Sequence, residues 1–296
     1  MRIRRKPEPQ YDGAAEPQPL PELRPEFRAF GPIRTRVVES LDAPGPVVVL
    51  LHGFSDTLDT WTGVLRYLQA HGQPAVALDL PGYGAADALD HGRITEQIST
   101  FIADVVSHYD RPGEAPVLVG NSLGGFVAIL AGDEEADAVS GVVALTPGGF
   151  QHSRLLSFAA RASRLIGLTP EPIARYAATH VLPRMMVHDA VAGASAVETY
   201  LGQFGQRGQF RRVLSTAPRV SAELIHGPRH VPHVTVPVLV LWGQRDRLVP
   251  ATAALEVASR FPRGKHLILE RLGHCPQMEA PDRIGEIIAG FVHDLS

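Results

Sequence analysis

The stretch GNSLGG at residues 120–125 places a serine hydroxyl, Ser122, directly after an apolar run and between glycines. The spacing is G-x-S-x-G, and glycines are needed on both sides of a serine where the backbone turns sharply and neighbouring segments pass very close. A hydroxyl presented on such a turn can attack an electrophilic carbon. Because the pattern also occurs by chance, its meaning depends on whether the chain supplies a base that takes the serine proton.

Two further side chains have the types that such an attack requires. A serine hydroxyl is a weak nucleophile until a histidine removes its proton, and a carboxylate must hold that histidine in the correct tautomer. His274 follows the last apolar run, in LGHCPQMEAP, and Asp246 follows another apolar run, in LWGQRDRLVP. Both positions predict loops at the ends of strands, so we expect His274 and Asp246 to meet Ser122 in space.

Attack on a carbonyl also creates an oxyanion, which backbone N–H groups can stabilise. A helix is expected to start near Leu123, and the free N–H groups at a helix start favour negative charge. The Leu123 N–H is therefore one candidate donor. The second candidate is the Phe54 N–H, in the loop that follows the apolar run PVVVLLHG.

These groups need a scaffold that brings the ends of several strands together. From residue 26 onward short apolar runs alternate with amphipathic segments, a pattern that predicts a mostly parallel sheet with helices on both faces. FRAF and IRTRVVES suggest an antiparallel hairpin. The run at 46–53 predicts a strand buried on both faces. Further strands are expected at 74–80, 116–122, 140–147, 236–243 and 265–272, and helices at 59–71, 94–106, 124–134, 251–261 and near the end of the chain.

The pattern also predicts how the chain is divided. Residues 1–25 are rich in proline and form an extension that cannot build a packed core. Residues 26–149 and 235–296 form the core of the α/β architecture. Residues 150–234 have the pattern of several short helices without a buried strand, and we expect them to form a helical lid over the strand ends, where ligands usually bind.

Composition limits the classes of partner. The chain has 296 residues, of which 45% are hydrophobic and 20% charged, and its formal net charge is -3. These values are typical of a soluble globular protein and do not favour binding to nucleic acid or to anionic membranes. No apolar run is long enough for stable insertion into a membrane, and a single cysteine, Cys275, excludes an intramolecular disulfide. We expect a cytoplasmic protein with a small-molecule substrate and no cofactor; the sequence does not indicate its oligomeric state.

Five motifs occur together in one order: HGF after the first buried strand, DLPGYG at 79–84, GNSLGG, WGQRDRLVP and GHCPQMEAP. In this combination the chain resembles the α/β-hydrolase family over roughly residues 26–149 and 235–296. The resemblance implies a catalytic triad of Ser122, Asp246 and His274. It also implies that the backbone N–H groups of Phe54 and Leu123 form the oxyanion hole. A serine at this turn, rather than an aspartate, distinguishes the chain from the haloalkane dehalogenase and epoxide hydrolase branches.

The leading functional hypothesis is hydrolysis of a carboxylic ester through an acyl-serine intermediate. A second hypothesis is cleavage of a carbon–carbon bond, because GNSLGG also resembles the meta-cleavage product hydrolases. Those relatives tend to have a glycine-rich loop after HG and a tryptophan after the catalytic histidine, whereas this chain has Phe54, Ser55 and Asp56 in the loop and Cys275 after the histidine. A third hypothesis is a ligand-binding member of the fold with little turnover.

The lid sequence suggests what the substrate is like. It contains many apolar side chains, some of which should line a pocket above the serine, so the substrate should be an ester that is apolar on its acyl or alcohol side. The candidate substrate-binding residues are Tyr83, Phe158, Met185 and Met186. His226, His230 and His233 have a spacing that metal sites can show, but Gly227 and Pro228 prevent a shared helical face and no cysteine or carboxylate accompanies them. No metal site is therefore predicted.

Overall fold

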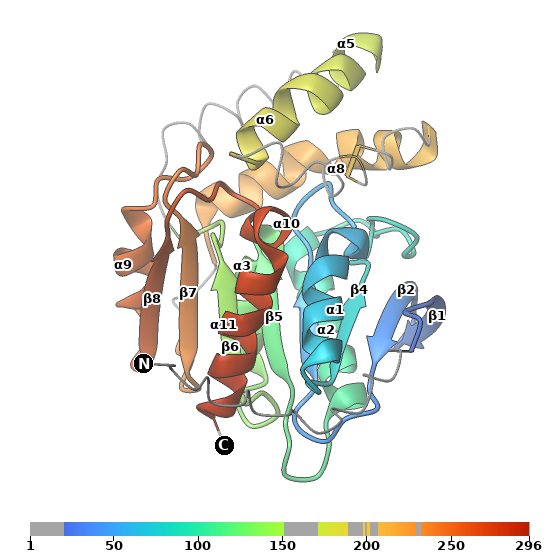
Figure 1. Cartoon of the computed structure of the whole chain (residues 1–296). Coiled ribbons are helices and arrows are strands. Elements are labelled where there is room, and N and C mark those ends of the chain that lie inside the picture. Colours follow the sequence, from blue (N-terminus) through green and yellow to red (C-terminus); the bar gives the residue numbers. More distant parts are fainter. Residues whose placement is uncertain are drawn as a thin grey trace, which may run out of the picture.

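A computed structural model describes residues 21–150, 171–188, 198, 200–201, 207–228 and 232–295. Its centre is an eight-stranded sheet in the order β1-β2-β4-β3-β5-β6-β7-β8 (Figure 1). β2 pairs antiparallel with β1 and with β4, and all other neighbours pair in parallel. The mostly parallel sheet and the antiparallel hairpin at its edge confirm the predicted fold class.

The strands have these bounds: β1 Pro25–Phe30, β2 Ile33–Ser40, β3 Val48–Leu51, β4 Ala75–Leu78, β5 Val117–Asn121, β6 Gly141–Leu145, β7 Val238–Gly243 and β8 Gly264–Leu269. The helices that accompany the sheet are η1 Leu58–Trp61, α1 Thr62–Ala70, α2 Ile94–Tyr109, α3 Leu123–Glu134, α9 Ala253–Ala258, α10 Pro276–Glu279 and α11 Pro281–His293. Each of the predicted strands and helices is present, with ends that differ from the prediction by a few residues.

Side chains of the central strands alternate between two apolar layers, because successive residues of a strand point to opposite faces. Val49 and Leu51 pack with α2, α3 and α9 on one face. Val48 and Leu50 pack with α1 and α11 on the other face, and these two helices lie in front of the sheet in Figure 1. Burial on both faces explains why these strands are continuous apolar runs rather than alternating ones.

Within its described residues, the chain between β6 and β7 contributes further helices: α5 Glu171–Tyr176, η2 Ala177–Val181, α6 Leu182–Met186 and α8 Arg207–His226. They lie above one end of the sheet in Figure 1. Phe150 and Val234, at the two ends of this insertion, are both buried in the main core. The Glu223 carboxylate of α8 accepts hydrogen bonds from the Ile94 and Thr95 N–H groups at the start of α2, which ties α8 to the sheet layer.

Among the described residues, no helix is long and apolar enough to cross a bilayer.

Candidate active site

Ser122 occupies a strained turn between β5 and α3. Its backbone angles are φ 53° and ψ -109°, a region that residues with a side chain rarely adopt. Three hydrogen bonds hold it there: the Ser122 N–H donates to the Leu145 carbonyl, and the Ser122 carbonyl accepts from the N–H groups of Phe126 and Gly148. Strain maintained in this way presents a side chain at the end of a strand, as a nucleophile requires.

The glycines around Ser122 are required by close backbone contacts. A Cβ atom on Gly120 would lie 2.2 Å from the backbone carbon and oxygen of Gly124. A Cβ atom on Gly124 would lie 2.2 Å from the Leu51 carbonyl oxygen of β3. Side chains at these two positions would therefore push α3 away from the strands, and the G-x-S-x-G spacing has a geometric cause in this chain.

His274 and Asp246 are hydrogen-bonded to each other in loops that follow β8 and β7. The distance from His274 Nδ1 to Asp246 Oδ2 is 2.8 Å, and the two side chains are only 6% and 0% exposed. The carboxylate accepts, so Nδ1 carries the proton and Nε2 keeps a lone pair. The Oδ1 atom of Asp246 accepts from the N–H groups of Leu248 and Val249, which fixes the carboxylate in its own loop.

Asn121 and Thr146 hold the backbone of His274, and the sequence analysis missed both. Asn121 Nδ2 donates to the His274 carbonyl at 2.9 Å, and Thr146 Oγ1 donates to the same oxygen at 2.9 Å. Asn121 ends β5, Thr146 directly follows β6, and both are buried. An amide directly before the serine was the available signal, since a buried amide at a strand end needs partners.

The loop after β3 carries the Phe54 N–H, and His52 fixes the start of this loop. His52 Nδ1 lies 2.8 Å from the Gly53 carbonyl, and His52 Nε2 accepts from the Leu80 N–H. Burial lowers the pKa of His52, so it serves this loop as a neutral ring. Neither the Phe54 N–H nor the Leu123 N–H has an acceptor among the residues that the structure describes, which leaves both available to a substrate oxygen.

A cavity of about 130 Å³ opens beside these groups. Ser122, His274 and Phe54 line it together, with Gly148, Leu248 and Val249 from the loops around them. One side of α8 closes it with the side chains of Val220, Ser221, Leu224 and Ile225. The structure thus brings the predicted serine and histidine to one cavity, and the α8 side chains that form its wall are uncharged.

Tyr83, Met185 and Met186, which were predicted to bind substrate, are not among the residues that line this cavity. Tyr83 is buried behind Phe54, with its ring 5.9 Å from the Phe54 ring. Met186 is buried in a cluster with Cys275, and Met185 precedes it at the end of α6. Phe158 lies outside the described residues. Their contact with substrate stays a prediction, whereas α8 supplies the wall that the sequence analysis did not single out.

Buried ionisable groups lie behind the site. Burial raises the pKa of Asp56 to about 7; its carboxylate accepts from the Thr57 N–H and the Thr60 hydroxyl. Burial also raises the pKa of the Cys275 thiol, and the carboxylates of Asp56, Asp246 and Glu279 raise it further. The thiol is therefore protonated at neutral pH, which disfavours it as a nucleophile.

The histidines of the 226–233 region do not form a site within the described residues. His226 ends α8, the His233 N–H donates to Asp133, and His230 lies outside the described residues. In the part of the chain that is described, no three His, Cys, Asp or Glu side chains are grouped to hold a metal ion.

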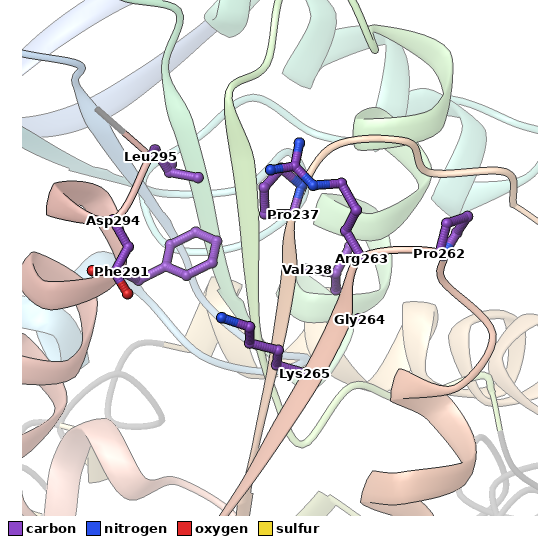
Figure 2. A pocket seen from close by; sticks show the side chains of 9 residues that line it. All are labelled: Pro237, Val238, Pro262, Arg263, Gly264, Lys265, Phe291, Asp294 and Leu295. Atoms are coloured by element: carbon purple, nitrogen blue, oxygen red, sulfur yellow. The ribbon is translucent and has the colours of Figure 1, made fainter.

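A second hollow, of about 390 Å³, lies where β7 and β8 begin and α11 ends. Figure 2 shows Arg263, Lys265, Phe291 and Asp294 around it. Because β7 and β8 are parallel, their beginnings face away from the strand ends that carry Asp246 and His274. None of the described site residues lines this hollow, so we assign it no part in the chemistry.

Comparisons with known proteins show the family of the chain. A model of the "Alpha/beta hydrolase family" matches residues 48–287. The chain is 29% identical over 262 residues to a pimeloyl-[acyl-carrier protein] methyl ester esterase of Vibrio vulnificus, covering 85% of this chain and 93% of that protein. It is 28% identical to a dihydrolipoyllysine-residue acetyltransferase component of an acetoin cleaving system of Pseudomonas putida, with 84% of this chain covered; the match spans only 64% of that protein's length.

Similarity extends to enzymes that act on other bonds. A 2-hydroxy-6-oxononadienedioate/2-hydroxy-6-oxononatrienedioate hydrolase of Cupriavidus pinatubonensis is 26% identical, with 84% of this chain and 88% of that protein covered. Among solved structures, a 2-hydroxy-6-oxo-6-phenylhexa-2,4-dienoate hydrolase of Rhodococcus sp. strain RHA1 superposes with a TM-score of 0.72 at 21% identity, covering 91% of this chain and 98% of that one. A membrane phospholipase A superposes with a TM-score of 0.75 at 20% identity, covering 92% and 86%. At these identities the two structures show a shared fold alone.

Proposed function

Because this chain belongs to the alpha/beta hydrolase family, we propose that it is a serine hydrolase that cleaves carboxylic esters of apolar small molecules through an acyl-serine intermediate. One observation carries the proposal: Ser122 on its strained turn and His274, which is hydrogen-bonded to Asp246, line one cavity. This arrangement supplies a nucleophile, a base and a group that orients the base.

In the proposed first half-reaction, Ser122 Oγ attacks the ester carbonyl carbon while its proton passes to His274 Nε2. The oxyanion that forms accepts hydrogen bonds from the Phe54 and Leu123 N–H groups, and Asp246 stabilises the imidazolium. The bond to the alcohol oxygen then breaks, and this oxygen takes the proton from Nε2. The acyl group remains on Ser122.

In the second half-reaction, water attacks the acyl carbon and gives one proton to His274 Nε2. The bond to Ser122 Oγ breaks, Oγ takes that proton back, and the carboxylic acid leaves. The helices of 150–234 are proposed to act as the lid over this cavity. Phe158, Met185, Met186 and Tyr83 remain candidates for contact with the rest of the substrate, and Val220 and Leu224 of α8 support an apolar acyl or alcohol group.

Hydrolysis of a carbon–carbon bond is the second candidate, and the similarity to the dienedioate hydrolase supports it. The substrates named for such relatives carry carboxylates. Among the described residues that line the cavity, His274 is the one ionisable side chain, and neither arginine nor lysine is present. A carboxylate would lose its hydration there without a cation to replace it, and this favours the ester as substrate.

The test supplies p-nitrophenyl butyrate and a 2-hydroxy-6-oxo-dienoate side by side to the same preparation. We expect turnover of the ester, with a loss of about 10⁴-fold or more in Ser122→Ala and His274→Ala. Turnover of the dienoate alone would replace the proposal with carbon–carbon hydrolysis. Binding of either compound without turnover would support a ligand-binding protein instead.

A further inference from the structure

A short segment of the insertion, residues 184–188, lies against both loops that carry the paired acid and base. It consists of the end of α6 and the two residues after it. The Cys275 N–H donates to the Met186 carbonyl at 3.0 Å. A Cβ atom on Gly273 would lie 2.9 Å from the His188 nitrogen and 3.1 Å from the Met186 oxygen, so the two backbones are in direct contact on either side of His274.

Glu279, at the end of α10, joins the same two segments through its carboxylate. Oε1 accepts from the Gly273 N–H at 2.7 Å, and Oε2 accepts from the His188 N–H at 2.8 Å. The side chain is buried, with the residue 5% exposed. Charge-assisted hydrogen bonds to backbone N–H groups are among the stronger ones in proteins, so this carboxylate ties the histidine loop to the insertion.

The loop of Asp246 is bound to the same segment. Arg245 Nη1 donates to the His188 ring, and Arg247 Nη1 donates to the Arg184 carbonyl. Asn121 and Thr146 hold the His274 carbonyl from the sheet side. The backbone on both sides of the imidazole therefore depends on residues 184–188 and on Glu279 as well as on the core.

On the premise of the proposed function, we propose that Glu279 is a positioning residue: it couples residues 184–188 of the insertion to the His274 loop and thereby sets the direction of the imidazole toward Ser122. Displacing the insertion from this contact would then impair proton transfer as well as open the cavity. An error of about 1 Å in the placement of a catalytic group can lower a rate about 100-fold.

The discriminating variant is Glu279→Gln, which keeps the size of the side chain. Its amide oxygen can still accept from one of the two backbone N–H groups, but its amide NH2 group then faces the other N–H group, so that two donors oppose each other. We expect kcat at its high-pH plateau to fall about 10-fold to 100-fold, with KM changed by less than about threefold. In the wild type, the proton between His274 Nδ1 and Asp246 Oδ2 should give a strongly deshielded NMR resonance. In Glu279→Gln this resonance should weaken, because the ring no longer points directly at Asp246. This resonance is a readout that a purely structural role would not move.

The value of kcat at the high-pH plateau distinguishes misplacement of the imidazole from simple loss of the Glu279 charge. Asp246, Asp56, Cys275 and Glu279 are ionisable groups on the inner side of the His274 loop, and His188 and Arg245 lie on the side of the insertion. Removing the negative charge of Glu279 destabilises the imidazolium and shifts the midpoint of the pH profile downward. That effect alone leaves the plateau above the midpoint unchanged, whereas misplacement of the imidazole lowers the plateau.

Glu223→Gln is the matched control. Glu223 is also a buried carboxylate that binds two backbone N–H groups, but it contacts the start of α2 and not the His274 loop. We expect this variant to lower the melting temperature while both the pH midpoint and the Nδ1 resonance stay as in the wild type. A lower melting temperature with an unchanged plateau in Glu279→Gln would overturn the inference.

A second pair of variants tests the coupling if Glu279→Gln does not fold. Arg247→Ala removes an exposed side chain that binds the Arg184 carbonyl, and its plateau kcat should fall several-fold. Arg260→Ala removes an exposed arginine that pairs with Glu256 instead, and its activity should match the wild type. Equal plateaus in the two arginine variants would overturn the coupling. Failure of the proposed function is a separate result, since the wild type would then show neither ester turnover nor labelling of Ser122 by a fluorophosphonate.

Discussion

Asp246 serves two purposes with its two carboxylate oxygens. Oδ1 accepts from two N–H groups of its own loop, and Oδ2 accepts from His274 Nδ1. The contacts of Oδ1 hold the carboxylate in its loop, and the contact of Oδ2 leaves it facing the imidazole.

Asp246→Asn therefore separates orientation from folding. The amide oxygen can keep the two loop hydrogen bonds, while the amide nitrogen faces His274 Nδ1 and forces the ring into the tautomer with the proton on Nε2. That ring cannot accept the Ser122 proton. We expect kcat to fall about 10³-fold to 10⁴-fold with little change in melting temperature, measured by ester turnover and calorimetry. Retention of more than about a tenth of the activity would assign the orienting role to another carboxylate.

Asp56 gives a second prediction, on stability. Burial raises its pKa from 3.8 to about 7, so between about pH 4 and 7 the folded state holds a proton that the unfolded chain has released. The free energy of unfolding therefore falls as pH rises through this window and levels off above it. The Asn side chain of Asp56→Asn does not titrate, so this fall in the free energy of unfolding is absent from the variant. Urea unfolding should show the variant gaining stability relative to the wild type from pH 5 to pH 8, by on the order of a few kcal/mol.

Asp282→Asn removes an exposed carboxyl at the start of α11 and is the control. Its free energy of unfolding relative to the wild type should be the same at pH 5 and pH 8. If the difference between Asp56→Asn and the wild type is the same at pH 5 and pH 8, Asp56 is not a buried acid of raised pKa.

At the scale of elements, contact between α3 and β3 determines which residues can flank the serine. Gly124 lies in the first turn of α3, and its backbone meets the carbonyl oxygens of Leu51 and His52 directly. The G-x-S-x-G pattern was visible in the sequence, but the strand that excludes a side chain at Gly124 was not, since that contact joins residues about 70 positions apart.

Gly124→Ala should be strongly destabilising, because the new Cβ atom meets backbone that cannot move aside. We expect a loss of about 3 kcal/mol or more in the free energy of unfolding, or no folded protein. Gly290→Ala is the control: a Cβ atom there meets nothing within 4 Å, and alanine in the α11 helix should stabilise by about 0.5–1 kcal/mol. Similar stabilities for the two variants would contradict the close contact described for α3.

The α8 wall gives a prediction about chain length. Leu224 lines the cavity and packs over Gly148, so Leu224→Ala should make room for about three more carbons. Each buried methylene contributes up to about 0.8 kcal/mol, and kcat/KM for a series of p-nitrophenyl esters from acetate to decanoate should reach its maximum at a longer acyl chain than in the wild type. Ser215→Ala, on the exposed side of α8, should leave the profile unchanged. Identical profiles for Leu224→Ala and the wild type would remove α8 from the acyl site.

At the scale of the whole molecule, the sequence was sufficient for the sheet and insufficient for the contacts around the site. β3 to β7 are buried parallel strands with a local signature of continuous apolar residues, so they could be predicted one by one. The apolar run of β8 also predicted a strand, although most of β8 is exposed at the edge of the sheet. The positions of Asp246 and His274 followed from the ends of those strands. The contacts of Asn121, Thr146 and Glu279 could not be predicted, because each includes a backbone group far away in the sequence.

The segment predicted to form a lid illustrates the same limit. Its apolar residues indicated helices, but a helical pattern does not reveal which helix lines the cavity. Met186 of α6 packs in a cluster with Cys275, while Val220 and Leu224 of α8 line the cavity together with Ser122. Phe158 lies outside the described residues, so its place in the pocket stays a prediction.

If the Asp246–His274 pair activates Ser122, a fluorophosphonate should label this serine rapidly. Intact mass and peptide mapping should show one adduct, on Ser122. The adduct should form faster as pH rises, since His274 must be neutral to accept the serine proton. In folded His274→Ala the labelling should be slower by several orders of magnitude. Absence of an adduct on the folded wild type, or an equal rate in His274→Ala, would contradict the account.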